Sequence, residues 1–233
     1  MSSRPRVAVI IPAYNEEQRI GAVLQAVTKS KLADEVIVVS DASHDRTATI
    51  ARSFEGVKVI ELAFNAGKGG AMAAGGAATD AEILAFTDAD LLDLRPDHID
   101  QIIRPILGGV CDMCIGVFRG GKFWSETAQR ISPYISGQRA LRREIFEAIP
   151  FIGEIRFGVE VTLNTYAKRN KARVLRVVLQ GVSNTFKESK MGLVKGVQAR
   201  GKMYAEIGRA LVRMRRKNKP KKRVTKRQGK KKP

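Results

Sequence analysis

The sequence has very few of the residues that hold a structural metal or a disulfide. Its 233 residues include two cysteines and two histidines. Cys111 and Cys114 form a single CxxC pattern, which is typical of a redox pair or of half a zinc site. A complete zinc site needs two more ligands, and the sequence has neither a second CxxC nor paired histidines. We therefore predict two buried, reduced thiols, as expected in a reducing cytosol.

Long apolar runs are also absent. No stretch of 18 or more apolar residues occurs, so a membrane-spanning helix is not expected. Residues 1–17 lack the order of a signal peptide, because their apolar run is short and charged residues follow it at once. We predict a cytoplasmic protein that can bind peripherally to the inner face of the cell membrane.

Acidic residues are missing from the C-terminus. Residues 213–233 contain 13 Lys or Arg and no acid, so of the net charge of +19 only +6 belongs to residues 1–212. Residues 193–217 are predicted to form a basic amphipathic helix, and residues 218–233 a disordered tail. Each basic side chain near an anionic bilayer contributes about 1 kcal/mol, which favours membrane attraction. The alternative is a helix packed on the domain with a solubilising tail. We favour packing on the domain for the apolar side of the helix, and membrane attraction for the tail.

Aromatic residues are absent from the same tail, which has no side chains on which bases could stack. The sequence also has no zinc-finger or RRM signature. Nucleic acid would attract such a tail electrostatically, but we do not expect specific recognition.

Apolar residues, at 44%, are sufficient for a substantial core. In the first hundred residues, short β-branched runs alternate with apolar residues at helical spacing. The pattern predicts an α/β domain over residues 1–192, with a mostly parallel central sheet and helices on both faces. Ligands bind such sheets beyond the carboxyl ends of the strands. One crevice should therefore collect the loops 12–17, 40–45, 65–70 and 88–93.

Several local structures follow from the pattern. Asn15 and Ser43 are interpreted as caps of the helices that follow them, and His98 is placed on the exposed side of its helix. Further predicted elements are, in order, a strand at 110–118, helical pieces in 123–149 broken at Pro133 and Gly137, a helix in 154–170 and a strand at 172–179.

An acidic pair closes the fourth predicted strand. Asp88 and Asp90 flank one small residue, so in an extended segment both carboxylates share a face. A divalent cation takes one or two carboxylates plus substrate phosphates, and offsets charge on a departing diphosphate. The alternative is a polar turn, with Asp93 capping the next helix. A DxDx[TV] phosphatase nucleophile is set aside, because the pair follows the fourth strand and position 92 is Leu.

Four segments at ordered spacings carry a family resemblance: "VAVIIPAYNEEQRI", "EVIVVSDASHDRT", "NAGKGGAM" and "FTDADL". Together they resemble the family 2 inverting glycosyltransferases of the GT-A fold, with motifs IPxYNE, VVDDxSxDxT, NxGKGxA and DAD. The resemblance covers residues 7 to about 192. "SGQRALRREIFEAI" and "KESKMG" are more loosely similar to segments of dolichyl- and polyprenyl-phosphate mannose synthases within this family, where the first reads SGFRxYRR.

The resemblance implies a metal-dependent enzyme that moves a hexose from a UDP- or GDP-sugar to an acceptor, with Mg²⁺ or Mn²⁺ as cofactor. The implied acceptor is a polyprenyl or other lipid phosphate at the membrane surface. A soluble phosphorylated acceptor is one alternative. A non-catalytic scaffold that binds membrane or nucleic acid through its basic tail is another.

The resemblance also implies roles for individual residues. Asp88 and Asp90 would hold the metal, with Asp90 counted among the catalytic residues. Glu160 would be the catalytic base, although a solvated helical Glu is an equal reading. The remaining candidates would bind the donor: Pro12, Ala13, Tyr14, Glu16, Asp41, Lys68, Asp88, Ala89 and Arg139. Arg119, Arg130 and Lys190 are weaker candidates for phosphate contacts.

The sequence departs from the family pattern at two positions. The second strand ends in Ser40-Asp41 where the family has two acids, and Leu92 stands where mannose synthases often carry a metal-holding Gln. Asp93 is therefore left open as a third ligand or a helix cap. Neither His44 nor His98 looks like the downstream His ligand of some members.

Overall fold

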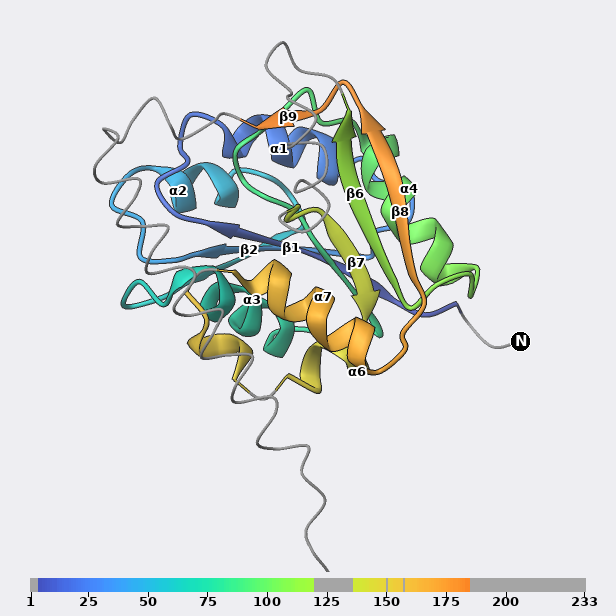
Figure 1. Ribbon diagram of the computed structural model, residues 1–233. Helices are drawn as coiled ribbons and strands as arrows, with labels where there is room; N and C mark the ends of the chain where they lie inside the picture. Colours follow the sequence, from blue (N-terminus) through green and yellow to red (C-terminus); the bar gives the residue numbers. More distant parts are fainter. Residues whose placement is uncertain (1–3, 120–135, 150, 157, 185–233) are drawn as a thin grey trace, which may run out of the picture.

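The computed structural model describes residues 4–119, 136–149, 151–156 and 158–184 (Figure 1). Arg130, Pro133, Lys190, the predicted C-terminal helix and the predicted tail lie outside these residues. The elements in chain order are β1 (Val7–Ala13), α1 (Ile20–Val27), β2 (Glu35–Ser40), α2 (Thr47–Arg52), β3 (Val57–Glu61), α3 (Gly67–Ala77), β4 (Ile83–Phe86), β5 (Leu91–Leu92), α4 (Pro96–Leu107), β6 (Met113–Arg119), β7 (Arg139–Arg142), α6 (Arg143–Glu147), the 3-10 helix η1 (Ile152–Glu154), α7 (Val159–Arg169), β8 (Val174–Gln180) and β9 (Ser183–Asn184).

The central sheet has the strand order β3-β2-β1-β4-β7-β6-β8. The first four of these strands are parallel; β7 runs antiparallel to β4 and β6, and β8 is parallel to β6. The chain leaves β1 on one side for β2 and β3, then returns to the other side for β4. This switch opens a crevice beyond the carboxyl ends of β1 and β4, where ligands bind such sheets. The predicted α/β class is confirmed.

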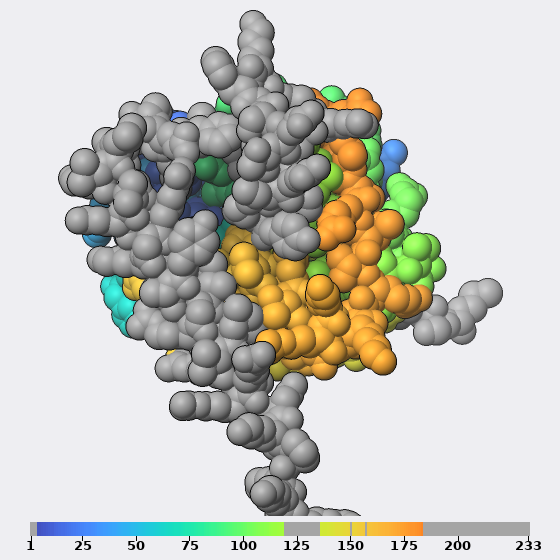
Figure 2. Space-filling view, viewed as in Figure 1, coloured from blue at the N-terminus to red at the C-terminus, as the bar shows by residue number. Residues whose placement is uncertain are grey.

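Strand β1 is buried on both faces because its alternate side chains enter two different cores. Val7, Val9 and Ile11 pack with residues of α1, α2 and α4, whereas Ala8 and Ile10 pack with residues of α3, α6 and α7. Figure 1 shows these two groups of helices on opposite faces of the sheet. Figure 2 shows α7 and the edge strand β8 at the surface of one face.

The two predicted helix caps are wrong. Asn15 adopts a left-handed conformation with φ 54°, and its Oδ1 accepts a hydrogen bond of 2.8 Å from the backbone N–H of His44. Ser43 Oγ accepts from the backbone N–H of Asn15 at 3.1 Å. Both side chains therefore join the loop after β1 to the loop after β2. Helices α1 and α2 start later, at Ile20 and Thr47.

His98 is another correction, because it is fully buried rather than exposed. Its Nδ1 accepts a 3.1 Å hydrogen bond from the backbone N–H of Arg95, the residue that caps α4. Burial, together with the nearby Arg95 guanidinium, lowers the pKa of His98. Since Arg95 is the cap, Asp93 is not; Asp93 is exposed and has φ 58°.

The second half of the chain follows the prediction in part. β6, α7 and β8 form where a strand, a helix and a strand were expected. The "SGQRALRR" segment, predicted as helical, instead supplies β7, which fills the gap between β4 and β6. Cys111 and Cys114 are buried and free, as predicted, and burial with the neighbouring Cys111 raises the pKa of Cys114 to about 12. Within the described ranges, no helix is long and apolar enough to cross a membrane.

The glycines in the first turn of α3 pack against η1 and the residues that follow it. A Cβ at Gly69 would overlap the carbonyl oxygens of Ile152 and Ile155, and the backbone N–H of Gly69 donates to Ile155 O at 3.0 Å. A Cβ at Gly67, which has φ 79°, would lie 2.7 Å from Cα of Arg156, two residues after η1. The "GKGG" glycines thus allow η1 and the residues after it to pack closely against the start of α3.

Gly69→Ala is expected to lower the free energy of unfolding by about 1–3 kcal/mol, because overpacking forces backbone to move. Gly21→Ala in α1 is the matched control, since its added methyl would meet only Ile50 Cγ2 at 3.7 Å. The free energy of unfolding of Gly21→Ala should rise by about 0.5–1 kcal/mol, because Ala is more stable than Gly within a helix. Urea denaturation of both variants measures the contrast, and equal effects at the two positions would contradict it.

Candidate active site

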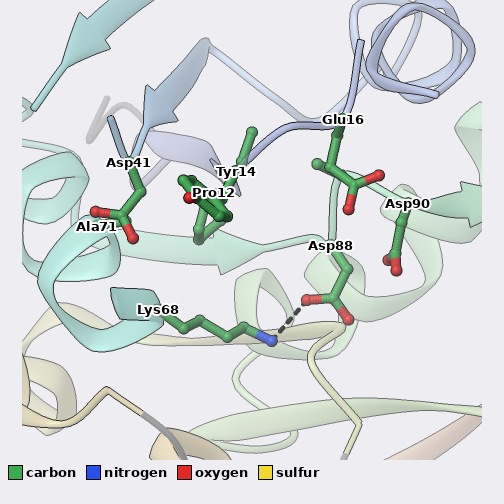
Figure 3. Close-up of a pocket in the computed structure, with 10 residues that line it drawn as sticks. Pro12, Tyr14, Glu16, Asp41, Lys68, Ala71, Asp88 and Asp90 are labelled. Carbon is green, nitrogen blue, oxygen red and sulfur yellow. Dashed lines mark hydrogen bonds and ion pairs between the residues drawn. The ribbon is translucent and has the colours of Figure 1, made fainter. Parts of the chain in front are cut away.

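A cavity of about 270 Å³ opens at the carboxyl ends of β1, β2 and β4 and at the start of α3. All but one of its lining residues were predicted from the sequence, Ala71 being the exception. Asp41 lies at one end, the carboxylates of Glu16, Asp88 and Asp90 at the other, and Pro12 and Tyr14 between them (Figure 3). The ten lining residues are Pro12, Ala13, Tyr14, Glu16, Asp41, Lys68, Ala71, Asp88, Ala89 and Asp90.

The Glu16 end of the wall is fixed by hydrogen bonds to neighbouring elements. Its backbone N–H donates to Thr47 Oγ1 at 2.8 Å, and its carboxylate accepts from the Arg19 guanidinium at 3.1 Å. Tyr14 is 44% exposed, so its ring is a free edge of the cavity wall. The wall therefore combines a rigid acidic end with an accessible aromatic face.

Asp41 organises the start of α3 as well as lining the cavity. Its two carboxylate oxygens accept the backbone N–H groups of Ala66 and Gly67, at 2.7 and 2.9 Å. A carboxylate at a helix N-terminus is favoured by the helix dipole and by these otherwise unpaired donors. Asn65 strengthens the turn, because its amide donates to Asp41 O and its Oδ1 accepts from the Arg156 guanidinium at 2.6 Å. Asp41 thereby positions Lys68, which immediately follows Gly67.

Lys68 joins two carboxylates from distant parts of the chain. Its Nζ lies 2.6 Å from Asp88 Oδ1 and 2.6 Å from Glu160 Oε1. Burial disfavours the ammonium, but the two carboxylates outweigh it and raise the pKa of Lys68. Burial likewise disfavours ionised Asp88, but Lys68 outweighs it and lowers the pKa of Asp88. Lys68 and Asp88 are thus charged at neutral pH. The ion pair with Lys68 also brings Glu160 next to the DxD pair, although Glu160 does not line the cavity.

Arg139 is placed differently from the prediction. It is fully buried and is not among the residues that line the cavity. Its guanidinium donates to Ser136 O at 2.6 Å, Asn164 Oδ1 at 3.2 Å and Glu160 O at 3.4 Å. It therefore holds the first turn of α7, and with it Glu160, and this arrangement gives no support to a direct contact with donor phosphate.

Three contributors to the site were missed from the sequence. Gln138 donates to Asp88 Oδ2 at 2.8 Å, Asn164 accepts from Arg139, and Arg156 bridges to Asn65. Gln138 lies inside the "SGQR" segment, but neither a motif nor a periodicity indicates what these three residues do, because each acts through a contact made across the fold. Leu92, the departure from the family pattern, is 40% exposed in β5 and is not among the cavity-lining residues.

Comparisons with known proteins identify the family of this chain. Residues 8–161 match the model of the family described as glycosyl transferase family 2. A dolichyl-phosphate β-glucosyltransferase of Drosophila melanogaster is 41% identical over 107 residues, which is 40% of this chain and 33% of that protein. A 4,4′-diaponeurosporenoate glycosyltransferase of Staphylococcus aureus is 37% identical over 103 residues, 42% of this chain and 27% of that protein. The chain thus spans about a third or less of these curated relatives.

Among solved structures, glucosyl-3-phosphoglycerate synthase of Mycobacterium tuberculosis, crystallised with Mn²⁺, UDP and glucosyl-3-phosphoglycerate, superposes with a TM-score of 0.70. It is 24% identical, with 89% of this chain and 79% of that chain covered, so it shows the fold alone. The predicted GT-A fold is confirmed. Because the family model spans well over half of the sequence, this chain belongs to glycosyl transferase family 2.

Proposed function

We propose that this protein transfers a hexose, with inversion, from a UDP- or GDP-sugar to an acceptor in a reaction that depends on Mg²⁺ or Mn²⁺. The observation that carries the proposal is the cavity itself. It joins an aromatic and acidic wall, suited to a nucleoside, to the Asp88–Asp90 pair and Lys68, suited to a diphosphate. Glu160 lies 2.6 Å from the same Lys68 Nζ, and we assign it to the acceptor.

The residues at the site fit a divalent cation whose coordination is completed by substrate phosphates. In the described part of the chain, no group of three or more His, Cys, Asp or Glu side chains could hold a metal on its own. Asp88 and Asp90 offer two carboxylates, and Mg²⁺ is commonly bound by one or two carboxylates together with substrate phosphates. When bound there, the cation would offset negative charge on the departing diphosphate. Solved structures of the M. tuberculosis synthase contain UDP with Mn²⁺ or Mg²⁺.

The chain's own groups supply the rest of the chemistry. Lys68, a compact charge on a flexible stem, would turn from Asp88 toward the leaving diphosphate oxygens. For a hydroxyl acceptor, the oxygen bonds to the anomeric carbon as the bond to the diphosphate breaks, and its proton passes to the Glu160 carboxylate. A phosphate acceptor arrives already anionic and needs no such base.

A lipid phosphate is the proposed acceptor, at the surface of an anionic membrane on the cytoplasmic side. Two observations support it: the name of the Drosophila relative, which is a dolichyl-phosphate β-glucosyltransferase, and the +13 charge of residues 213–233. A soluble phosphorylated acceptor is the second candidate, because the M. tuberculosis synthase has been crystallised with phosphoglyceric acid. Assays with polyprenyl phosphate in vesicles and with 3-phosphoglycerate in solution, using the same donor, decide between them.

Loss of metal-dependent nucleotide binding in the double variant Asp88→Ala/Asp90→Ala tests the proposal. We expect the wild type to bind UDP or GDP at least tenfold more tightly with Mn²⁺ than with EDTA, as measured by calorimetry. The double variant should lose this difference, because both carboxylates that complete the cation's coordination are removed.

The matched control is Asp80→Ala/Asp97→Ala, which removes two exposed carboxylates away from the cavity and should keep the wild-type difference. An Asp88→Ala/Asp90→Ala protein that still responds fully to Mn²⁺ would rule out the metal site. A wild type that binds only nucleic acid, with no affinity for either nucleotide, would support a non-catalytic scaffold instead.

A further inference from the structure

Asp88 is held from two sides, by groups that reach it from different elements. Its Oδ1 faces Lys68 Nζ, which lines the cavity. Its Oδ2 accepts a 2.8 Å hydrogen bond from Nε2 of Gln138, which immediately precedes β7 and is 1% exposed. An ionised carboxylate only accepts hydrogen bonds, so it is the nitrogen of the Gln138 amide that faces Asp88.

Gln138 is itself fixed at both its main chain and its side chain. Its backbone carbonyl accepts from the N–H of Gly116 in β6 at 2.8 Å. The hydroxyl of Ser136 lies 3.1 Å from Gln138 Oε1 and next to the carbonyl of Gly116, which ties the amide to the same strand. Ser136 is 8% exposed. The amide therefore has one orientation, with its oxygen toward Ser136 and its nitrogen toward Asp88.

Gly137 closes the same segment against the carboxylate. A Cβ at this position would overlap both carboxylate oxygens of Asp88 and would lie 2.6 Å from Lys68 Nζ. The main chain at residue 137 thus runs directly along the Asp88–Lys68 pair. Residues 136–138 together leave Asp88 little freedom to rotate.

We propose that Gln138 is a positioning residue, which holds the Asp88 carboxylate in the orientation required by the metal and diphosphate; this inference rests on the proposed function. A carboxylate has about four lone-pair sites, so one hydrogen bond to each oxygen leaves sites for a cation. Without Gln138, the only directional partner of Asp88 among the described contacts would be Lys68, which would draw the carboxylate toward itself. Partners of this kind typically change metal affinity by about 10- to 100-fold.

Gln138→Met, which keeps the size of the side chain and removes the donor, tests the inference. UDP and GDP are titrated into the protein with Mn²⁺ and with EDTA, and the ratio of the two dissociation constants is the readout. We expect this ratio to fall about 10- to 100-fold, with nucleotide binding in EDTA unchanged. Gln101→Met, at an exposed position of α4, is the matched control and should keep the wild-type ratio.

The outcomes separate the two proposals. A wild type whose binding ignores Mn²⁺ overturns the proposed function. A wild type that responds to Mn²⁺, beside a Gln138→Met protein with an equal ratio and only a lower melting temperature, overturns the positioning role. If Gln138→Met does not fold, Gln138→Asn takes its place. That variant keeps an amide but is one methylene too short to reach Asp88, so the same fall in the ratio is expected and its absence has the same meaning.

Discussion

Lys68→Met is expected to lower kcat/KM for sugar transfer by about 10²- to 10³-fold, with either acceptor. Removing one preorganised donor from a site where negative charge develops typically costs this much. The ammonium lies 2.6 Å from both Asp88 and Glu160, so the variant also leaves these two carboxylates without their shared counter-charge. Because Lys68 is 29% exposed, we expect a moderate loss of about 1–3 kcal/mol in unfolding free energy.

Added Mn²⁺ with UDP should restore part of that lost stability, because the cation supplies positive charge beside Asp88. Steady-state kinetics and thermal unfolding, each with and without Mn²⁺, measure the two effects. Lys29→Met, at an exposed position after α1, is the matched control and should resemble the wild type in both. Wild-type kcat/KM in Lys68→Met would show that the ammonium has no part in transfer.

Glu160→Gln is expected to lower kcat by about 10²- to 10⁴-fold with a hydroxyl acceptor, because the amide cannot take the proton. With a phosphate acceptor the loss should be much smaller, since that nucleophile is already anionic. The substitution is nearly isosteric in a side chain that is 11% exposed, so nucleotide binding with Mn²⁺ should stay close to that of the wild type. Single-turnover assays measure the contrast, with polyprenyl phosphate as the phosphate acceptor and 3-phosphoglycerate as the hydroxyl acceptor.

Glu55→Gln provides the control, because Glu55 is exposed and lies in the turn before β3. Equal losses with both acceptors would assign Glu160 a structural part through its ion pair with Lys68. An unchanged kcat with the hydroxyl acceptor would exclude Glu160 as the catalytic base, and a different residue would then have to take the proton.

The cavity wall could be predicted because its residues follow directly from short, contiguous motifs. Pro12 and Tyr14 belong to or follow β1, and Asp88 and Asp90 follow β4, so a parallel sheet brings them together at one edge. The predicted caps Asn15 and Ser43 failed for a related reason. Polar side chains after adjacent strands can bond to each other's loops as readily as to the next helix, and only the packed loops decide which partner is nearer.

The residues that support Asp88 and Glu160 from behind the cavity could not be predicted in the same way. Arg139 and Gln138 lie next to each other in a segment whose sequence looked helical, but β7 pairs with β4 and β6 because the sheet has an open position between them. That pairing turns Gln138 toward Asp88 and buries Arg139 under α7. The prediction for His98 was wrong because its ring accepts a hydrogen bond from the backbone N–H of Arg95. That hydrogen bond can form only when the helix begins at Pro96, so that Arg95 is its N-cap.

The sequence by itself determined the α/β order of the first hundred residues, the edge at which the ligand crevice lies, and nearly every residue that lines the cavity. These depend on strand periodicity and on loops of a few residues, which are local properties. Only the tertiary structure decided that Lys68 joins Asp88 to Glu160, that Asp41 caps α3, and that Arg139 supports α7 from within. Those contacts link residues that are distant along the chain, and a buried charge takes whichever partner the packed fold places within reach.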